Sequence, residues 1–361
     1  MKRRSFLSIS ACGALTGMAG TMAPIEAAAR IARGSDHPLW HLWQAWKDEH
    51  LDFTGRVIDG PQQRASHSEG QGYGMLLAAE FGDRDAFQRM SAWTDANLAI
   101  RRDNLLAWRW LPDVPERVPD LNNASDGDLF HAWALLRASE VFGQSSWRTR
   151  ALDVTADLIR LCVASRPDRP GTPILLPAEA GFIKQGGIIF NPSYVMPRAL
   201  RALADASGNA LLEQLAQSGL DLMAEIAAPG LIPDWLELTP AGPRPAEGFS
   251  PFAGYEAIRI PLFLIWSGEA GHRATLNAAT AMSRAPAGTA AVILHPTSGE
   301  IIEYSRDAGY RAIAALAQCS AFDETGSAMP PFSRNQPYYP ATLHLFALLA
   351  QIEMSPKCRP I

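Results

Sequence analysis

Apolar residues recur with helical spacing through almost the whole chain, and this periodicity constrains the fold more than any other feature. In residues 128–142, Leu129, Ala132, Trp133 and Leu136 fall at i, i+3, i+4 and i+7, which is one face of a helix. The same spacing predicts helices at 38–50, 72–80, 84–98, 151–164, 193–205, 210–226, 257–267, 272–282, 308–318 and 340–353. About eleven or twelve helical segments with no dividing linker predict one all-α domain of paired helices, with Trp133 in its core.

Four long connections rich in glycine and proline separate the helical stripes, at 55–68, 99–125, 165–191 and 227–255. Long connections inside a domain are usually functional or disordered. These carry large aromatic residues, so we expect ordered loops that form a cleft; the aromatic residues are Trp108, Trp110, Trp235, Phe252 and Tyr255. The segment 290–304 differs, because two apolar runs around Pro296–Gly299 predict a β-hairpin.

Residues 1–29 have the layout of an export signal and are set aside from the fold. Lys2, Arg3 and Arg4 precede an apolar stretch of small residues, and the alanines at 27–29 offer a cleavage site. The string KRRSFL resembles a twin-arginine signal, with Lys2 where Ser or Thr is usual. Polar residues and glycines interrupt the stretch, so we expect no stable membrane span. The predicted organisation is a leader over 1–29 and a single domain over 30–361, in the periplasm or secreted.

Composition narrows the classes of partner and site. The net charge is −5 and only 19% of residues are charged, which argues against nucleic acid as a partner because phosphates require a basic surface. Ten Trp against seven Tyr suit a neutral partner. Beyond the leader, Cys162, Cys319 and Cys358 allow one disulfide whose pairing stays open, and no Cys/His cluster indicates zinc.

Three glycines alternate in the segment SEGQGYGM at 68–75. The spacing is not G-x-G-x-x-G and no strand is predicted before it, so it does not indicate a dinucleotide site. Alternating glycines permit close approach of another backbone or tight packing of helices. Ser66 or Ser68 is a candidate cap for the following helix, with Glu69 in its first turn, where the helix dipole favours an acid. Capping and catalysis are equally open for Glu69 at this point.

Two further segments combine acids with helix starts. In NNASDGD at 122–128, Ser125 or Asp126 would make a good N-cap, but capping needs one polar residue and the stretch has five. The EF-hand calcium pattern, with its closing glutamate, is absent. In GYEAIRIP at 254–261, the proline places Glu256 and Arg259 at a helix start on one face. The simplest interpretation of the second segment is a local ion pair.

Together these three segments resemble glycoside hydrolase family 8, over about Trp40 to Leu349. SEGQGYGM at 68–75 and ASDGD at 124–128 are specific signatures, and NPSY at 191–194 and the pair Tyr338–Tyr339 also match. The resemblance implies an (α/α)6 barrel, in agreement with the helix count, and endo-acting hydrolysis of β-1,4-glucan with inversion, without metal or cofactor. It further implies trimming of nascent bacterial cellulose, with a cellulose synthase complex as a candidate partner.

The resemblance also implies roles for single residues. An inverting enzyme needs one protonated carboxyl group and one carboxylate that activates water. Glu69 matches the general acid, Asp126 the carboxylate at the −1 sugar, and Glu256 the general base. The substrate-binding matches are Arg259, Tyr194, Trp108 or Trp110, and Tyr338 or Tyr339.

Glu256 stands where the family has Asp, which is the main departure. The extra methylene can displace the carboxylate by more than about 1 Å unless the backbone retreats, and misplacement on that scale can cost about 10²-fold in rate. Three outcomes are open: Glu256 is a competent base in a re-spaced site, which we favour; another acid replaces it; or the enzyme is slow.

Two alternatives for the whole chain remain. The same fold can act on chitosan, xylan or mixed-linkage glucan, or the protein is a weakly active glucan-binding accessory of a polysaccharide-export complex. A polysaccharide lyase is disfavoured, because lyases act on uronic acids and need a basic cleft.

Overall fold

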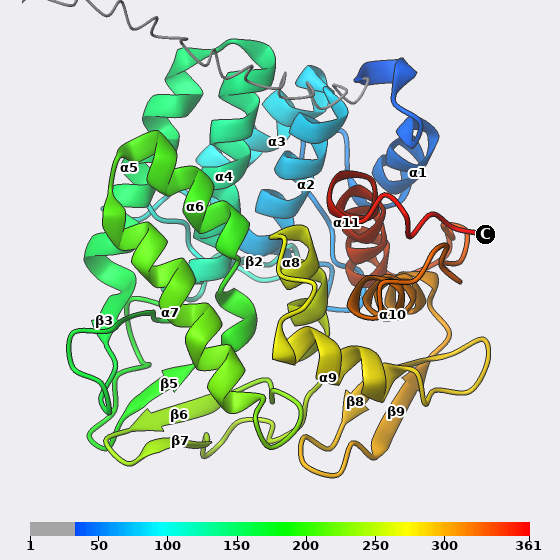
Figure 1. Ribbon diagram of the computed structural model, residues 1–361. Helices are drawn as coiled ribbons and strands as arrows, with labels where there is room; N and C mark the ends of the chain where they lie inside the picture. Colours follow the sequence, from blue (N-terminus) through cyan, green and yellow to red (C-terminus); the bar gives the residue numbers. More distant parts are fainter. Residues whose placement is uncertain (1–32) are drawn as a thin grey trace, which may run out of the picture. The chain divides into compact units, whose positions relative to one another are not determined.

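Eleven α-helices form the body of residues 33–361, which are the residues that the computed structural model describes (Figure 1). They are α1 (Trp40–His50), α2 (Ser68–Phe81), α3 (Arg84–Asn97), α4 (Ser125–Phe142), α5 (Ser145–Cys162), α6 (Pro197–Ser207), α7 (Ala210–Ile226), α8 (Ile260–Trp266), α9 (Arg273–Met282), α10 (Ala308–Ala321) and α11 (Tyr338–Met354). Each predicted stripe corresponds to one of these helices. The predicted leader at 1–29 lies outside the described residues.

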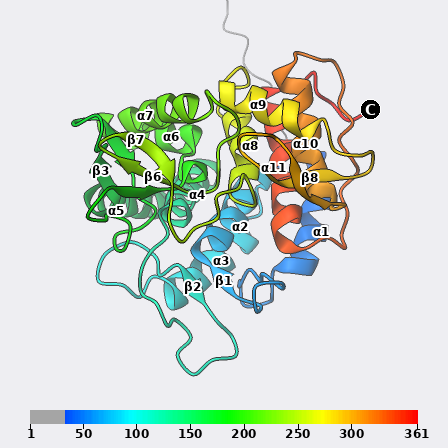
Figure 2. The same cartoon turned by 90° about the horizontal axis from the view of Figure 1, so that it is seen from below.

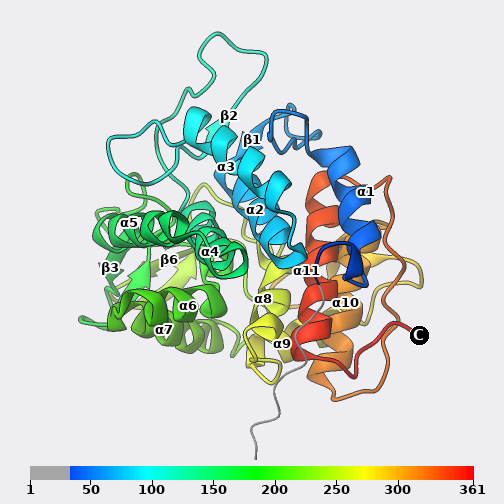
Figure 3. The same cartoon turned by 90° about the horizontal axis from the view of Figure 1, so that it is seen from above.

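The helices form two layers. Five of them, α2, α4, α6, α8 and α11, contact one another in a closed circuit, and α10 packs against α8 and α11. Outside this circuit α3, α5, α7 and α9 each pack on the preceding helix, and α1 packs on α11 and α2. Figure 3 shows this arrangement from above. The paired-helix domain that the sequence predicts is therefore confirmed, and Trp133, 2% exposed, lies in the core as expected.

The strands are short and antiparallel. The predicted hairpin is confirmed as β8 (Ala290–Leu294) paired with β9 (Ile301–Ser305). A three-stranded sheet of β5 (Ile188–Phe190), β6 (Leu236–Thr239) and β7 (Gly242–Pro245) was not predicted, and it joins two of the four long connections. Two more pairs are β1 (Ser66–His67) with β2 (Arg109–Trp110) and β3 (Val163–Ser165) with β4 (Pro173–Leu175). Figure 2 shows the molecule from below, with β6, β7 and β8 in front of the lower ends of the helices of Figure 1.

The C-terminal segment is tied to α10 by a disulfide between Cys319 and Cys358, which resolves the pairing that the sequence left open. Cys162 is buried and free. Within residues 33–361, no helix combines the length and the apolar character needed to cross a bilayer.

Candidate active site

The starts of α2 and α4 lie so close together that only glycine fits between them. A Cβ on Gly127 would stand 2.7 Å from the backbone N of Glu69, and one on Gly72 would stand 3.0 Å from the backbone N of His131. The prediction that alternating glycines serve close packing is confirmed. The contact sets Glu69 and Asp126, each in the first turn of its helix, side by side.

The predicted caps of these two helices are wrong. The N-cap positions are His67 and Ala124, and neither makes a side-chain cap. Ser125 instead donates from Oγ to the carbonyl oxygen of Leu176 at 2.6 Å. A long-range contact therefore takes up the Ser125 side chain, which local propensity assigns to capping.

Arg259 gathers the three predicted carboxylates around one buried guanidinium. Its Nη1 pairs with Glu69, and its Nη2 lies 3.0 Å from Oδ2 of Asp126 and 2.6 Å from Oε2 of Glu256. The arginine side chain is 1% exposed. The local Glu256–Arg259 pair of the sequence analysis exists, but it is one arm of a cluster that joins α2, α4 and the short 3-10 helix η3 (Ala257–Arg259).

Glu256 is anchored through one oxygen. Its Oε2 accepts from Arg259, from Asn191 Nδ2 at 3.3 Å and from Ser193 Oγ at 3.2 Å. Asn191 and Ser193 belong to the NPSY segment, and Asn191 also caps η2 (Pro192–Tyr194). The glutamate side chain is 33% exposed. Since the anchoring bonds all use Oε2, Oε1 is left for a water molecule.

A cavity of about 470 Å³ opens in front of this cluster. Glu69, Glu256, Arg259 and Tyr339 line it, as do Asp59, Tyr255, Asp307 and Tyr310. Asp126 does not line it; the side chain is 3% exposed and lies against Arg259. Glu69 and Glu256 thus face one space that is large enough for a sugar unit, with a guanidinium between them.

Two of the predicted aromatic residues, Tyr194 and Trp235, lie close to the carboxylate cluster or to each other. Tyr194 lies beside the cluster, with the Arg259 guanidinium 5.5 Å from the centre of its ring and Trp235 6.0 Å away. Phe182 and Phe249 also pack on Trp235, which gives an aromatic group outside the helix ring.

The other aromatic residues differ in their surroundings. Trp108 is half-buried, and its Nε1 donates to Asp120 at 2.9 Å. Trp110 packs on Trp93 in a small separate cluster. Tyr338 is 1% exposed and its ring packs against Trp46, so Tyr339 alone of the tyrosine pair lines the cavity.

Burial shapes the protonation of the acids. Burial raises the pKa of Glu69, the charges of Glu256 and Asp59 raise it further, and Arg259 opposes the rise. Burial also raises the pKa of Asp126, again against Arg259. A carboxyl group with a raised pKa keeps its proton in the pH range in which an ordinary glutamate has lost it.

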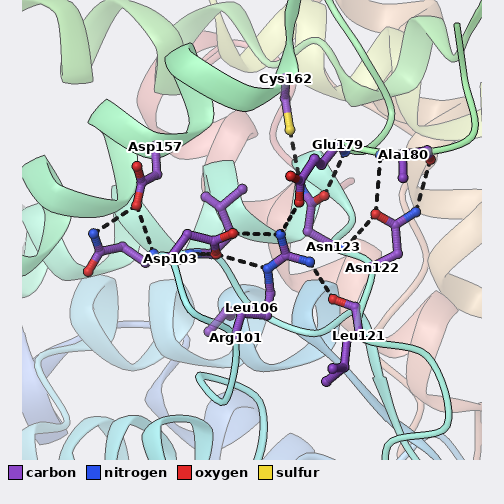
Figure 4. A network of polar contacts seen from close by, with 12 residues as sticks. Arg101, Asp103, Leu106, Leu121, Asn122, Asn123, Asp157, Cys162, Glu179 and Ala180 are labelled. Atoms are coloured by element: carbon purple, nitrogen blue, oxygen red, sulfur yellow. Dashed lines mark hydrogen bonds and ion pairs between the residues drawn. The ribbon is translucent and has the colours of Figure 1, made fainter.

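A second polar network braces the loop 99–125 against the body of the domain. Arg101 pairs with Asp103 at 2.7 Å and with Glu179, and Asn123 donates to Cys162 Sγ at 3.2 Å (Figure 4). Asp128 accepts from the backbone N of Leu106 at 2.8 Å and from Asn123 at 2.9 Å. Asp128 thus anchors the loop that carries Trp108.

Among residues 33–361, no three His, Cys, Asp or Glu side chains are grouped in a way that could hold a metal ion. Sequence reasoning missed Asp59 and Asp234 near the site, because neither lies in a recognisable motif. The only signal for Asp234 is its place next to Trp235 in a long connection.

Known protein families and solved structures include relatives of this chain. The family model described as "Glycosyl hydrolases family 8" matches residues 19–353. The chain belongs to glycosyl hydrolase family 8. A relative named "Probable endoglucanase" from Novacetimonas hansenii is 33% identical to this family 8 hydrolase over 316 residues, which are 86% of this chain and 90% of the relative.

Two solved structures are similar to this hydrolase. The endo-beta-1,4-glucanase CMCax from Acetobacter xylinum superposes with a TM-score of 0.79 at 30% identity, covering 87% of this chain and 98% of that one. Endoglucanase Cel10 from Klebsiella pneumoniae gives a TM-score of 0.78 at 30% identity, covering 86% and 99%. The predicted (α/α)6 barrel is confirmed.

Proposed function

We propose that this family 8 hydrolase cleaves internal bonds of β-1,4-glucan with inversion, with Glu69 as general acid and Glu256 as general base. The observation that carries the proposal is that both glutamates face one cavity and are held by the same arginine. The relatives are named as an endoglucanase and an endo-beta-1,4-glucanase, which supports the choice of polymer and of endo action.

Each carboxyl group has a distinct task. Glu69, whose pKa is raised by burial, donates its proton to the leaving oxygen, and Glu256 removes a proton from the attacking water on the opposite face of the sugar. The resemblance places Asp126 at the −1 sugar, but Asp126 does not line the cavity, so we propose that it acts on the site by holding Arg259 at 3.0 Å. Arg259 holds the carboxyl groups of Asp126 and Glu256 in place through Nη2.

The anchoring of Glu256 favours the first of the three outcomes for this departure from Asp. The fixed Oε2 and the open Oε1 suit a carboxylate that activates water. The bonds to Arg259 and Ser193 hold the longer side chain in one position. A competent base in a re-spaced site is therefore the version that we propose.

The place of action that we propose is the periplasm or the medium outside the cell. The leader at 1–29 supports export, and the Cys319–Cys358 bridge suits an oxidising compartment. There the enzyme would trim nascent cellulose, with a cellulose synthase complex as a partner.

The variant Glu69→Gln tests the assignment of the acid. We expect it to lose nearly all hydrolysis of soluble carboxymethyl-cellulose, because the amide cannot donate the proton, while its thermal unfolding stays close to that of the wild type. Glu237→Gln is the matched control, since Glu237 is a buried glutamate on β6 that pairs with Arg244 away from the cavity. Retained hydrolysis by Glu69→Gln would refute the role of Glu69.

Product analysis of the wild type tests the rest of the proposal. Endo action lowers the viscosity of the polymer faster than it releases reducing ends, and NMR of the first products should show an inverted anomeric carbon. Faster cleavage of chitosan, xylan or mixed-linkage glucan than of β-1,4-glucan would change the substrate and keep the mechanism. Tight binding of cello-oligosaccharides without cleavage would favour a glucan-binding accessory.

A further inference from the structure

The turn that carries Glu256 is held by a carboxylate that belongs to no motif. Asp234 lies just before β6 and is 7% exposed. Its Oδ1 accepts hydrogen bonds from the backbone N–H groups of Gly254 and Ala257, both at 2.8 Å. These two amides stand on either side of Glu256, so one buried oxygen fixes the peptide on which the base is mounted.

Gly254 fits the same carboxylate closely. A Cβ at this position would lie 2.7 Å from Oδ2 of Asp234, and a short buried side chain has little room to move aside. The backbone N–H of Asp234 in turn donates to the carbonyl oxygen of Phe252 at 2.8 Å. The segment before β6 and the segment before Glu256 therefore contact each other through both backbone hydrogen bonds and the Asp234 side chain.

Further contacts also hold the turn, and one of them spans Glu256: the backbone N–H of Ile258 donates to the carbonyl oxygen of Gly254 at 2.9 Å. The hydroxyl of Tyr339 donates to the carbonyl oxygen of Tyr255 at 2.8 Å, and Ala253 pairs with Leu294 of β8. Asp234 directly precedes Trp235 of the aromatic group. The segment that carries Trp235 and the turn that carries Glu256 thus share one anchor.

Burying the Asp234 carboxylate costs folding free energy. It has no ion pair with a Lys, Arg or His side chain among residues 33–361, and burial raises its pKa against the stabilising effect of the backbone amides. A buried charge without a cationic partner disfavours folding unless hydrogen bonds compensate it. The carboxylate is placed where its bonds determine the position of Glu256.

We propose that Asp234 is a positioning residue for hydrolysis, which acts through Glu256 by fixing the backbone on both sides of it. The inference rests on the proposed function, because Glu256 is the base only in that proposal. A misplacement of about 1 Å in a reacting group can cost about 10²-fold in rate. Loss of Asp234 therefore reduces kcat and leaves the contacts of the substrate, and so KM, nearly unchanged.

The test compares Asp234→Ala with Asp234→Asn in the full chain on soluble cello-oligosaccharides. We expect Asp234→Ala to lower kcat roughly 100-fold and to change KM less than about twofold. Because both bonds go to Oδ1, the amide oxygen of Asp234→Asn can accept them, and we expect it to recover at least about tenfold of the loss. Glu237→Gln, three residues along the chain, is the control and should leave both constants within about twofold of the wild type.

A double-mutant cycle separates positioning from a general effect on folding. In a Glu256→Gln background, the base is already lost, so Asp234→Ala should lower the remaining kcat by less than about threefold. If the kcat losses of the two single variants multiply in the double variant, Asp234 acts independently of Glu256 and the proposal is overturned. An Asp234→Ala variant that keeps the wild-type kcat would also overturn it.

Gly254→Ala keeps the proposal testable if Asp234→Ala does not fold. It crowds the carboxylate instead of removing it, so we expect a kcat loss in the same direction with little change in KM. An unchanged kcat in folded Gly254→Ala counts against the positioning role. A wild type that binds but never cleaves β-1,4-glucan would refute the proposed function instead, so the two failures are distinguishable.

Discussion

Arg259 is one positive charge in contact with three carboxyl groups, Glu69, Asp126 and Glu256. One guanidinium cannot compensate three neighbouring negative charges, so the cluster favours a proton on one of the acids. The pKa of Glu69 is raised by burial and by nearby acids, and Glu69 also faces the cavity. An acid that stays protonated and is accessible is what a glycosidic oxygen requires as a proton donor.

The nearby charge of Asp59 provides a test of this arrangement. The general acid must be protonated, so kcat/KM falls as pH rises through the pKa of Glu69 in the free enzyme. Asp59 lines the same cavity and its negative charge raises the pKa of Glu69. Asp59→Asn should lower that pKa and move the alkaline limb of the profile to lower pH. Activity should drop roughly two- to fivefold on the limb and little below it.

Asp307→Asn is the control, because Asp307 lines the same cavity and its charge is not among the main influences on the pKa of Glu69. Its alkaline limb should remain where the wild-type limb lies. Profiles of kcat/KM on one cello-oligosaccharide from pH 4 to about 9 are the measurement. A limb that moves to higher pH in Asp59→Asn would contradict the assignment.

Single residues also show how far sequence reasoning reaches. The identities of the three acids could be read from motifs, but their common partner could not. Arg259 meets Asp126 across 133 positions of sequence and Glu69 across 190, and no local pattern reports such a contact. For the same reason the capping rules offered Ser125 or Asp126 as the N-cap, although tertiary contacts take both side chains.

The close contact between the starts of α2 and α4 positions Glu69 and Asp126 in the site. Gly127→Ala adds a methyl group 2.7 Å from the backbone N of Glu69, so one helix must move. We expect a destabilisation of about 1–3 kcal/mol, because this crowding outweighs the gain of about 1 kcal/mol in helix propensity. We also expect a kcat loss of at least about tenfold, since Glu69 shifts with its helix.

Denaturant unfolding and kcat on a soluble glucan would measure these two effects. Gly271→Ala is the matched control, because nothing lies within 4 Å of its added Cβ, and it should resemble the wild type in both assays. A Gly127→Ala variant with wild-type stability and kcat would show that the interface tolerates a methyl group.

The helices and the strands differ in how well the sequence predicts them. All eleven α-helices of residues 33–361 were predicted, because apolar residues at helical spacing form a pattern within one continuous segment of the chain. Several predicted starts were late, as in α5, which begins at Ser145 and not at 151. The sheet of β5, β6 and β7 was missed because its strands have three or four residues. That is too short for an alternating pattern, and β5 pairs with a strand more than forty residues away.

At the scale of the whole molecule, the disulfide that stabilises the fold lies apart from the cavity where the reacting groups are. Tyr310 of α10 lines the cavity, and Cys319 lies nine residues further along the same helix, or about 13 Å at 1.5 Å per residue. The bridge to Cys358 is supported by backbone bonds from Gly326 to Lys357 at 2.7 Å and from Ser327 to Arg359 at 2.8 Å. It therefore fixes the C-terminal segment at a distance from the reacting groups.

Removing the bridge should cost stability and spare catalysis. The bridge closes a loop with a sequence separation of 39, for which the chain-entropy relation gives about 4 kcal/mol. The double variant Cys319→Ser/Cys358→Ser should lose stability on that order in denaturant unfolding and keep a kcat within about twofold of the wild type at 25 °C. Reductant is the internal control, since it should destabilise the wild type and leave the double variant unchanged. A large loss of kcat in the folded double variant would mean that the C-terminal segment shapes the cavity, and the separation of roles along α10 would then be wrong.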